Sequence, residues 1–372
     1  MCDSIDEYFG INPTCSSSDE NRRRKLRKGV WSSTDATWAE SIVERYNRTT
    51  VPLLREAASG VAVIADTPIR IPKIIHFIWL GSRPIPLHFK AEEGGIDTRS
   101  DTNTDIQGWN ECMRSWLKHH PPSSGWIIRL WTEMEVRSSF FDDSPECTST
   151  MTNQAAYDYA LSKQNYGLAS DILRLELLSS FGGVYVDIDY LCMAPLDDLH
   201  SAAAFYCGAS SVGCVEINNG LLGCAVRHKV VQLVIEDIGK WFEKNMEQGE
   251  SETAAPPVAA SVFLSSFLDT ETTQSLTRAK ELTHEDVIRH TGPGLITRMM
   301  MAVLVDVADV GDEQDNEGMD RVMVLPAQYF HSLPNDSRAD VGEYEAADAF
   351  SKKICRNDTT RAVHLWGCSW QN

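Results

Sequence analysis

The chain has 372 residues and a formal net charge of −19 at pH 7, from 34 Lys and Arg against 53 Asp and Glu. Nucleic acids and anionic membrane surfaces are disfavoured as partners, because binding to phosphate-rich surfaces depends on Lys and Arg. The length suits one enlarged α/β domain with a preceding segment.

Residues 1 to 68 are expected to form an N-terminal arm, distinct from residues 69 to 372. The arm is polar, includes the basic run Asn-Arg-Arg-Arg-Lys-Leu-Arg-Lys at 21 to 28, and has few apolar positions. We expect it to be flexible or partly helical on the surface, since such a segment buries little apolar surface. The basic run is typical of a solvated face, although a nuclear or membrane-surface signal has the same composition.

Apolar strands alternate with helical stretches along the rest of the chain. The spacing predicts strands at 61 to 65, 73 to 80, 126 to 131, 184 to 188 and 220 to 225, and helices at 111 to 118, 154 to 179 and 228 to 247. This alternation predicts an α/β fold with a largely parallel sheet covered by helices and ligands bound beyond the carboxyl ends of the strands. The polar stretches 91 to 107, 248 to 257 and 311 to 320 are expected to be surface loops.

One predicted helix carries a pair of opposite charges. From residue 166 to 180, apolar residues recur at helical spacing, and Gly182 and Gly183 end the pattern. Asp171 and Arg174 are three positions apart on another face, so both side chains aim at one surface patch. An ordinary surface ion pair has the same spacing.

Two aspartates follow the apolar strand that begins after this helix. Asp187 and Asp189 are two positions apart, and strand alternation places both on the same side as Tyr185. Two converging carboxylates repel each other, and a hard divalent cation with oxygen ligands removes that conflict. The pair therefore predicts half of a metal site, with a solvated strand end as the alternative.

The stretch from Tyr166 through Asp189 resembles the signature block of the DXD sugar-transferase family. This family includes yeast initiation-type α-1,6-mannosyltransferases, α-1,4-galactosyl- and N-acetylglucosaminyltransferases and, more distantly, the glucosylating domains of clostridial toxins. Other blocks resemble the family in the same order, and together they cover about residues 69 to 372: 71 to 81, 115 to 121, 126 to 131, 218 to 223, 291 to 294 and 364 to 370.

The resemblance implies that residues 69 to 372 form the catalytic domain of a metal-dependent retaining glycosyltransferase with a GT-A type fold. The donor would be a nucleotide-diphosphate sugar carrying mannose, galactose, glucose or N-acetylglucosamine, and the acceptor a glycan, a glycolipid or a protein. The implied ion is Mn²⁺ or Mg²⁺, and Mn²⁺ is favoured because it also accepts imidazole. A toxin-like protein glucosyltransferase and a non-catalytic nucleotide-sugar or glycan binder on the same fold are the alternatives.

The resemblance also implies roles for particular residues. Asp187 and Asp189 would hold the metal, with His364 and Ser369 as candidates to complete its shell; for His364, simple packing is an equal alternative. Asp171, Arg174 and Asn219 would contact the donor sugar, the diphosphate and the reaction centre. Candidates to bind the nucleotide are Trp79, Ile78, Tyr166, Ser170 and Trp370, although Trp79 also suits a buried core and Tyr166 and Ser170 also suit packing.

Both aspartates are thus committed to metal, so no carboxylate is left to act as the nucleophile of a two-carboxylate route. Our hypothesis is a front-face reaction in which the leaving phosphate helps to deprotonate the acceptor. A metal-dependent phosphohydrolase would need a second cluster of His and carboxylates, which the sequence does not clearly supply. His76 lies within a strand and is expected to be a core residue.

The sequence does not decide the cellular compartment of the protein. The family resemblance favours the Golgi or secretory lumen, and sequons at Asn47, Asn335 and Asn357 suit it. We find no apolar run of membrane-spanning length and no signal-peptide core, which leaves a cytoplasmic enzyme possible. The 10 cysteines include no Cys-x-x-Cys pair, which disfavours a structural zinc site, and their spacing leaves disulfide pairing undecided.

Overall fold

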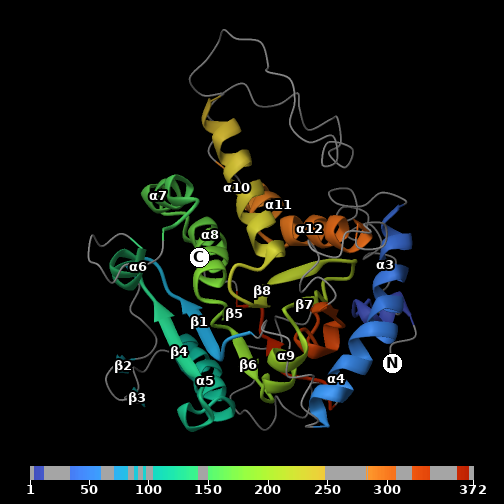
Figure 1. Ribbon diagram of the computed structural model, residues 1–372. Helices are drawn as coiled ribbons and strands as arrows, with labels where there is room; N and C mark the ends of the chain where they lie inside the picture. Colours follow the sequence, from blue (N-terminus) through green and yellow to red (C-terminus); the bar gives the residue numbers. More distant parts are fainter. Residues whose placement is uncertain are drawn as a thin grey trace.

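The computed structural model describes residues 4–11, 34–59, 71–82, 88–90, 95–97, 104–140, 150–247, 282, 284–306, 321–335 and 358–367. At its centre is a six-stranded sheet with the order β4-β1-β5-β8-β7-β9 (Figure 1). Its strands are β1 (Ile74–Ile78), β4 (Ile127–Trp131), β5 (Gly183–Val186), β7 (Phe205–Ala209), β8 (Ile217–Cys224) and β9 (Val322–Leu325).

The sheet is mixed and mostly parallel. β1 runs parallel to both β4 and β5, and β7 runs parallel to β9, whereas β8 is antiparallel to its two neighbours β5 and β7. The carboxyl ends of β1, β4 and β5 therefore meet at one edge of the sheet, where ligands of such folds bind. The expected α/β class with a mainly parallel sheet is confirmed.

Helices cover the sheet on two sides, with α8, α10 and α12 drawn above it and α4, α5 and α9 below it (Figure 1). The helices are α1 (Ile5–Tyr8), α3 (Thr34–Arg45), α4 (Val51–Ala58), α5 (Thr104–His119), α6 (Glu133–Phe140), α7 (Gln154–Ser162), α8 (Tyr166–Phe181), α9 (Asp197–Ala202), α10 (Lys229–Glu247), α11 (His284–His290) and α12 (Pro293–Asp306). A π-helix (Tyr46–Thr50) joins α3 to α4, and short 3-10 helices lie at Pro122–Ser124 and Ala327–Tyr329.

Two small antiparallel pairs accompany the main sheet. β2 (His88–Lys90) pairs with β3 (Gly95–Asp97), and β6 (Tyr190–Cys192) pairs with β10 (Ala362–His364). The second pair matters most, because it brings the C-terminal part of the chain back to the end of β5.

The described part of the N-terminal segment has exposed polar residues and a few large side chains that are buried. Tyr8 and Phe9 are fully buried, and the Tyr8 hydroxyl donates to the Val324 carbonyl at 2.5 Å. Trp38 and Tyr46 join the same hydrophobic core. The average polarity of the segment hid these few large apolar residues, and its described parts include α1, α3 and α4. The boundary at residue 68 and the basic run lie outside the described residues and stay predictions.

Several predicted elements have different bounds, and the stretch 91 to 107, expected to be a loop, contains β3 and the start of α5. The helix expected over 154 to 179 is interrupted between α7 and α8, where Gln164 has a φ of +55° and the Asn165 side chain caps α8 by accepting the Leu168 N–H at 3.0 Å. The strand expected over 184 to 188 ends at Val186. The strand at 61 to 65 and the loops at 248 to 257 and 311 to 320 lie outside the described residues.

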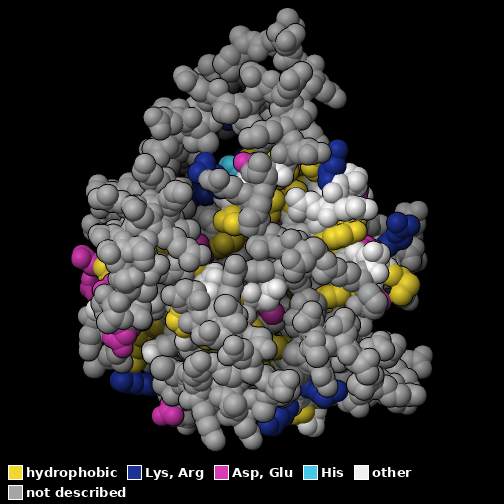
Figure 2. Space-filling view, turned by 180° about the vertical axis from the view of Figure 1, so that it is seen from behind, with side chains coloured by type: hydrophobic (Ala, Val, Ile, Leu, Met, Phe, Trp, Pro, Cys, Tyr) yellow, Lys and Arg dark blue, Asp and Glu magenta, His cyan; other side chains and the backbone are white. Residues whose placement is uncertain are grey.

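Within the described ranges, no helix has the length and apolar character needed to cross a membrane. On the face shown in Figure 2, the Lys and Arg side chains of the described residues are scattered and do not gather in one patch. This distribution agrees with the acidic composition.

His76 is a core residue, as expected. It is fully buried on β1, its Nε2 lies 2.8 Å from the Gly182 carbonyl, and its Nδ1 accepts the Trp131 indole N–H at 3.0 Å. Burial lowers the pKa of His76 from 6.5 to about 4, so the ring is neutral near pH 7.

This buried imidazole predicts that the fold loses stability in mild acid. Between its unfolded and folded pKa values, the unfolded chain binds a proton that the folded chain does not, so the free energy of unfolding falls as the pH falls from 6.5 to about 4. The full contribution is about 3 kcal/mol. Urea unfolding at about pH 7.5 and about pH 4.5 measures it. His76→Gln, which cannot titrate, should lose less stability than the parent between these pH values, and an equal loss would contradict the assignment.

Gly183 begins β5 with a φ of +92°, and a Cβ there would lie 2.5 Å from the Ile74 carbonyl oxygen. Gly183→Ala should therefore lower the free energy of unfolding by about 2–4 kcal/mol, from left-handed strain plus overpacking. Gly125 has a φ of +81° but nothing within 4 Å of its Cβ position, so Gly125→Ala carries the strain alone. Equal losses in urea unfolding would rule out the steric part of this explanation.

Candidate functional site

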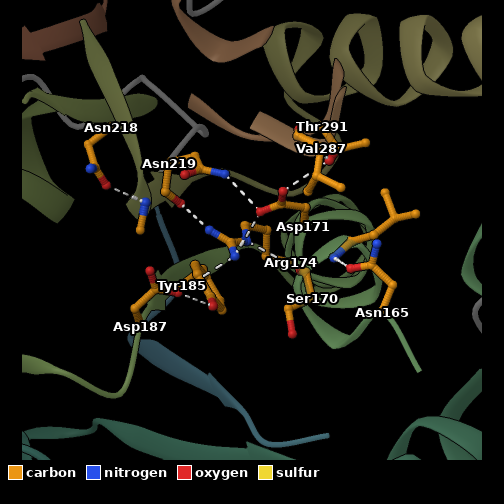
Figure 3. A network of polar contacts seen from close by, with 12 residues as sticks. Asn165, Ser170, Asp171, Arg174, Tyr185, Asp187, Asn218, Asn219, Val287 and Thr291 are labelled. Atoms are coloured by element: carbon orange, nitrogen blue, oxygen red, sulfur yellow. Dashed lines mark hydrogen bonds and ion pairs between the residues drawn. The ribbon is translucent and has the colours of Figure 1, made fainter. Parts of the chain in front are cut away.

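The Arg174 guanidinium lies at the centre of a polar network at the carboxyl end of β5 (Figure 3). It comes from α8, donates to the Asn219 carbonyl at 2.8 Å, and pairs with Asp171 at 2.9 Å and with Asp187 at 3.7 Å. Its plane also lies 4.4 Å from the centre of the Tyr185 ring. The helix pair expected from sequence is thus buried against the strand that carries the aspartates, and is not a surface ion pair.

Asp171 is almost fully paired by protein donors. Besides Arg174, it accepts the Asn219 side-chain amide at 2.9 Å and the Thr291 hydroxyl at 3.0 Å, and the residue is 7% exposed. Sequence reasoning gave Thr291 no role, because it lies 120 positions away in the chain. The only signal was its place in one of the blocks that resemble the family.

Asp187 lies just beyond the end of β5 and is the more exposed aspartate of the pair, with 30% of its side chain accessible. The Tyr185 hydroxyl donates to it, as expected for side chains on the same side of a strand. Gly220 of β8 leaves room for its carboxylate, because a Cβ there would lie 2.5 Å from Oδ2. Gly220 was not recognised from the sequence as part of the site.

Asp189 reaches the same place through a turn and not along a strand. The turn is closed by the Tyr190 N–H, which bonds the Asp187 carbonyl at 3.2 Å. Asp189 Oδ2 lies 3.2 Å from His364 Nε2 and accepts the Gly367 N–H at 2.7 Å. Pairing of β10 with β6 sets this contact, since His364 lies opposite Tyr190 in the register.

Asp187, Asp189 and His364 each offer one ligand atom, and these atoms lie within 4.8 Å of one another. Two carboxylates and one imidazole form a donor set that Mn²⁺ accepts. The His364 ring also has a buried Nδ1 that no described residue bonds, while its Nε2 faces Asp189. The residues therefore fit a divalent metal ion. Ser369 and Trp370 lie outside the described residues, so their expected roles stay predictions.

The pKa shifts of the three aspartates also agree with a metal site. Burial raises the pKa of Asp171 and of Asp187, although Arg174 opposes the rise in both. Burial also tends to raise the pKa of Asp189, but His364 and the Gly367 N–H outweigh this effect and hold that pKa below its usual value. Asp189 is therefore ionised most readily, which suits a direct metal ligand.

Of the five predicted nucleotide-binding residues, four lie within the described ranges, near the ends of β1 and α8. Trp79 is half-buried, and its N–H donates to the Trp131 carbonyl at 2.9 Å. Tyr166 packs against Gly81, whose N–H bonds the Glu133 carboxylate at 2.7 Å. The Ser170 carbonyl accepts Arg174 Nε at 3.2 Å, and the Ile78 side chain belongs to the core. Trp79 and Tyr166 therefore both flank the loop after β1.

Comparison with known proteins finds a family match in the middle of the chain. Residues 107–206 match the family described as "Glycosyltransferase sugar-binding region containing DXD motif". This segment contains Asp171, Arg174, Asp187 and Asp189.

Similar curated proteins include Inositol phosphoceramide mannosyltransferase 1 of Schizosaccharomyces pombe, 24% identical over 46% of this chain and 44% of the relative. Subversion of eukaryotic traffic protein A of Legionella pneumophila is 25% identical over 45% of this chain and 25% of that protein. The match thus spans less than half the length of these relatives. Among solved structures, PaToxG Glycosyltransferase is 14% identical, with 73% of this chain and 81% of that chain covered at a TM-score of 0.40.

The three-residue cluster predicts metal binding that calorimetry can measure. The chain should bind Mn²⁺, and Asp189→Asn should weaken binding by at least about 100-fold, because changes outside the ligand shell alone cost about 10–100-fold. Asp197→Asn is the matched control, since Asp197 pairs with Lys73 at 2.6 Å and is not part of the cluster. Equal Mn²⁺ affinities of parent and Asp189→Asn would contradict the assignment.

Proposed function

We propose that the chain is a metal-dependent glycosyltransferase, because residues 107–206 match the DXD-containing glycosyltransferase family. It moves a hexose from a nucleotide-diphosphate sugar to a hydroxyl acceptor. The observation that carries the proposal is the cluster of Asp187, Asp189 and His364 next to the buried Arg174. A cation site beside a fixed guanidinium suits the stabilisation of a leaving diphosphate.

The metal-binding residues are Asp189, Asp187 and His364, with Ser369 as a further candidate. A bound Mn²⁺ or Mg²⁺ supplies Lewis acidity to the departing diphosphate. Arg174 adds a permanent positive charge and donors that match phosphate oxygens. The guanidinium is already oriented by Asp171 and the Asn219 carbonyl, so it does not reorganise when charge develops on the leaving group.

The donor sugar lies beside Asp171 and Asn219 in this proposal. Each Asp171 oxygen has two lone-pair sites, and among the described residues only the Thr291 hydroxyl bonds Oδ2, so this oxygen can accept a sugar hydroxyl as well. Trp79 supplies an aromatic face for the nucleobase, and such stacking contributes about 1–3 kcal/mol per base. Tyr166, Ser170, the main chain at Ile78, and Trp370 would complete the nucleotide side.

We further propose that the anomeric configuration is retained. Asp187 and Asp189 are assigned to the metal, and Asp171 is buried against Arg174, Asn219 and Thr291, which leaves it poorly placed as a nucleophile. The route is therefore a front-face reaction: the acceptor oxygen bonds the anomeric carbon as its bond to the phosphate oxygen breaks. The acceptor proton passes to the leaving phosphate.

The hexose is mannose from GDP, or galactose, glucose or N-acetylglucosamine from UDP. The name of the fission-yeast relative favours mannose and a lipid acceptor, whereas glycan and protein acceptors fit the same site. A toxin-like protein glucosyltransferase is the second candidate, favoured by a Photorhabdus asymbiotica relative named Toxin, 30% identical over 33% of this chain. A non-catalytic binder is disfavoured, because Asp171 and Asp187 pair with the same buried Arg174, and Asp187 also belongs to the cluster with Asp189.

A screen of nucleotide-sugar hydrolysis tests the proposal. GDP-mannose, UDP-galactose, UDP-glucose and UDP-N-acetylglucosamine are each incubated with and without Mn²⁺. One donor should be hydrolysed in a metal-dependent way, and Asp189→Ala should lose at least about 100-fold in rate, since the metal carries the leaving-group charge. Asp197→Asn is again the control and should hydrolyse the donor like the parent.

Failure to turn over any donor under any metal, or full activity of Asp189→Ala, would contradict the enzyme assignment. NMR of the first-formed sugar product reports its anomeric configuration. A sugar attached covalently to a protein carboxylate, detected by mass spectrometry, would contradict the front-face route and leave the transferase assignment intact.

A further inference from the structure

Tyr190, the first residue of β6, contacts both sides of the proposed metal site. It follows Asp189 directly in the chain and is fully buried. Its ring packs on His364, and its hydroxyl reaches the β8 residues beside Asp187. No sequence motif singled out this residue.

The ring of Tyr190 fixes the orientation of the His364 imidazole. The two rings are stacked with centroids 4.3 Å apart and planes 4° from parallel. Trp366 packs against His364 as well, with centroids 4.1 Å apart at 42°. The imidazole is thus packed by two aromatic rings while its Nε2 lies 3.2 Å from Asp189, and rotation of the ring would lose these contacts.

The hydroxyl of Tyr190 fixes the strand segment that bounds Asp187. It donates to Asn218 Oδ1 at 3.2 Å and lies 2.7 Å from His331 Nε2, on a histidine that is 1% exposed. Asn218 Oδ1 also accepts the Gly220 N–H at 2.6 Å. The Gly220 carbonyl in turn accepts the Asp187 N–H at 2.8 Å. One hydroxyl therefore holds the side chain that braces the β8 segment against which Asp187 lies.

We propose that Tyr190 is a positioning residue of the metal site. Its ring holds His364 in place, and its hydroxyl holds the β8 segment beside Asp187. The proposal rests on the proposed function, because it assigns His364 and the Asp187 carboxylate to the same ion. Tyr190 itself does not touch substrate or metal. Its effect passes through His364 on one side and through Asn218 and Gly220 on the other.

The chain offers a closely matched control in Tyr206. This tyrosine is also fully buried, and its hydroxyl lies 3.0 Å from Nε2 of a buried histidine, His200. Its described partners, His200 and Phe330, belong to the interior and not to the metal cluster. Removing either hydroxyl deletes one buried Tyr–His hydrogen bond, but only one of the two bonds supports the site.

The experiment compares Tyr190→Phe with Tyr206→Phe in the full chain. Both variants should lower the urea midpoint, since each loses a buried Tyr–His hydrogen bond, and Tyr190→Phe should lower it further because it also loses the bond to Asn218. Calorimetric titration with Mn²⁺ should show about tenfold weaker binding for Tyr190→Phe, the effect typical of residues that orient metal ligands. Tyr206→Phe should bind Mn²⁺ like the parent.

A third variant separates the ring from the hydroxyl. Tyr190→Leu removes the stacking on His364 as well, so it should bind Mn²⁺ more weakly than Tyr190→Phe. Equal Mn²⁺ affinities of the parent and both Tyr190 variants would overturn the proposal and leave the proposed function standing. An equal loss in Tyr206→Phe would also overturn it, because the effect would then be a general loss of core stability. A parent that binds neither Mn²⁺ nor Mg²⁺ would overturn the proposed function and this role together.

Discussion

The buried guanidinium of Arg174 is the interaction on which the arrangement of the site depends. It stands between the carboxylates of Asp171 and Asp187 and also bonds the main chain of β8, so helix and sheet are joined through one charge. Removing one partner of a buried ion pair costs about 3–5 kcal/mol, because an uncompensated charge remains. This network holds the carboxylates in fixed positions, which a catalytic site needs and which a surface ion pair would not provide.

The charges around Arg174 do not balance within the protein. Asp171 and Asp187 share one guanidinium, Asp189 lies beside Asp187 in the cluster, and His364 adds a positive charge only when it is protonated. Burial raises the pKa of Asp171 and Asp187, and a neighbouring carboxylate adds to the rise in each, whereas Asp189 is held ionised by its own partners. A site with surplus negative charge near neutral pH has a strong demand for a cation. Once that cation is bound, the same site accepts a diphosphate, even in a chain of strongly acidic composition.

Local spacing predicted the parts of this site that lie close together in the sequence, and failed for the others. Asp171 and Arg174 share a helix face, so a three-residue interval was sufficient to pair them. Asp187 and Asp189 were expected to converge by strand alternation, and they do converge, but through a turn after Val186. Thr291 and Gly367 reach the aspartates from 120 and 178 positions away, and only tertiary packing creates such contacts. Composition failed for the N-terminal segment because the average over many polar residues concealed Tyr8 and Phe9.

The C-terminal segment shows that the site is completed only when the whole domain has folded. Trp366 adopts a φ of +56°, a conformation that bulky residues rarely take and that costs about 1–3 kcal/mol. Its ring packs on His364 and its indole N–H bonds the Leu333 carbonyl at 2.9 Å, so packing maintains the strained backbone. The turn at Trp366 directs the next N–H, that of Gly367, toward Asp189. The strained backbone at Trp366 thus directs the Gly367 N–H toward Asp189. The aromatic packing of Tyr190, His364 and Trp366 offsets the cost of this strain.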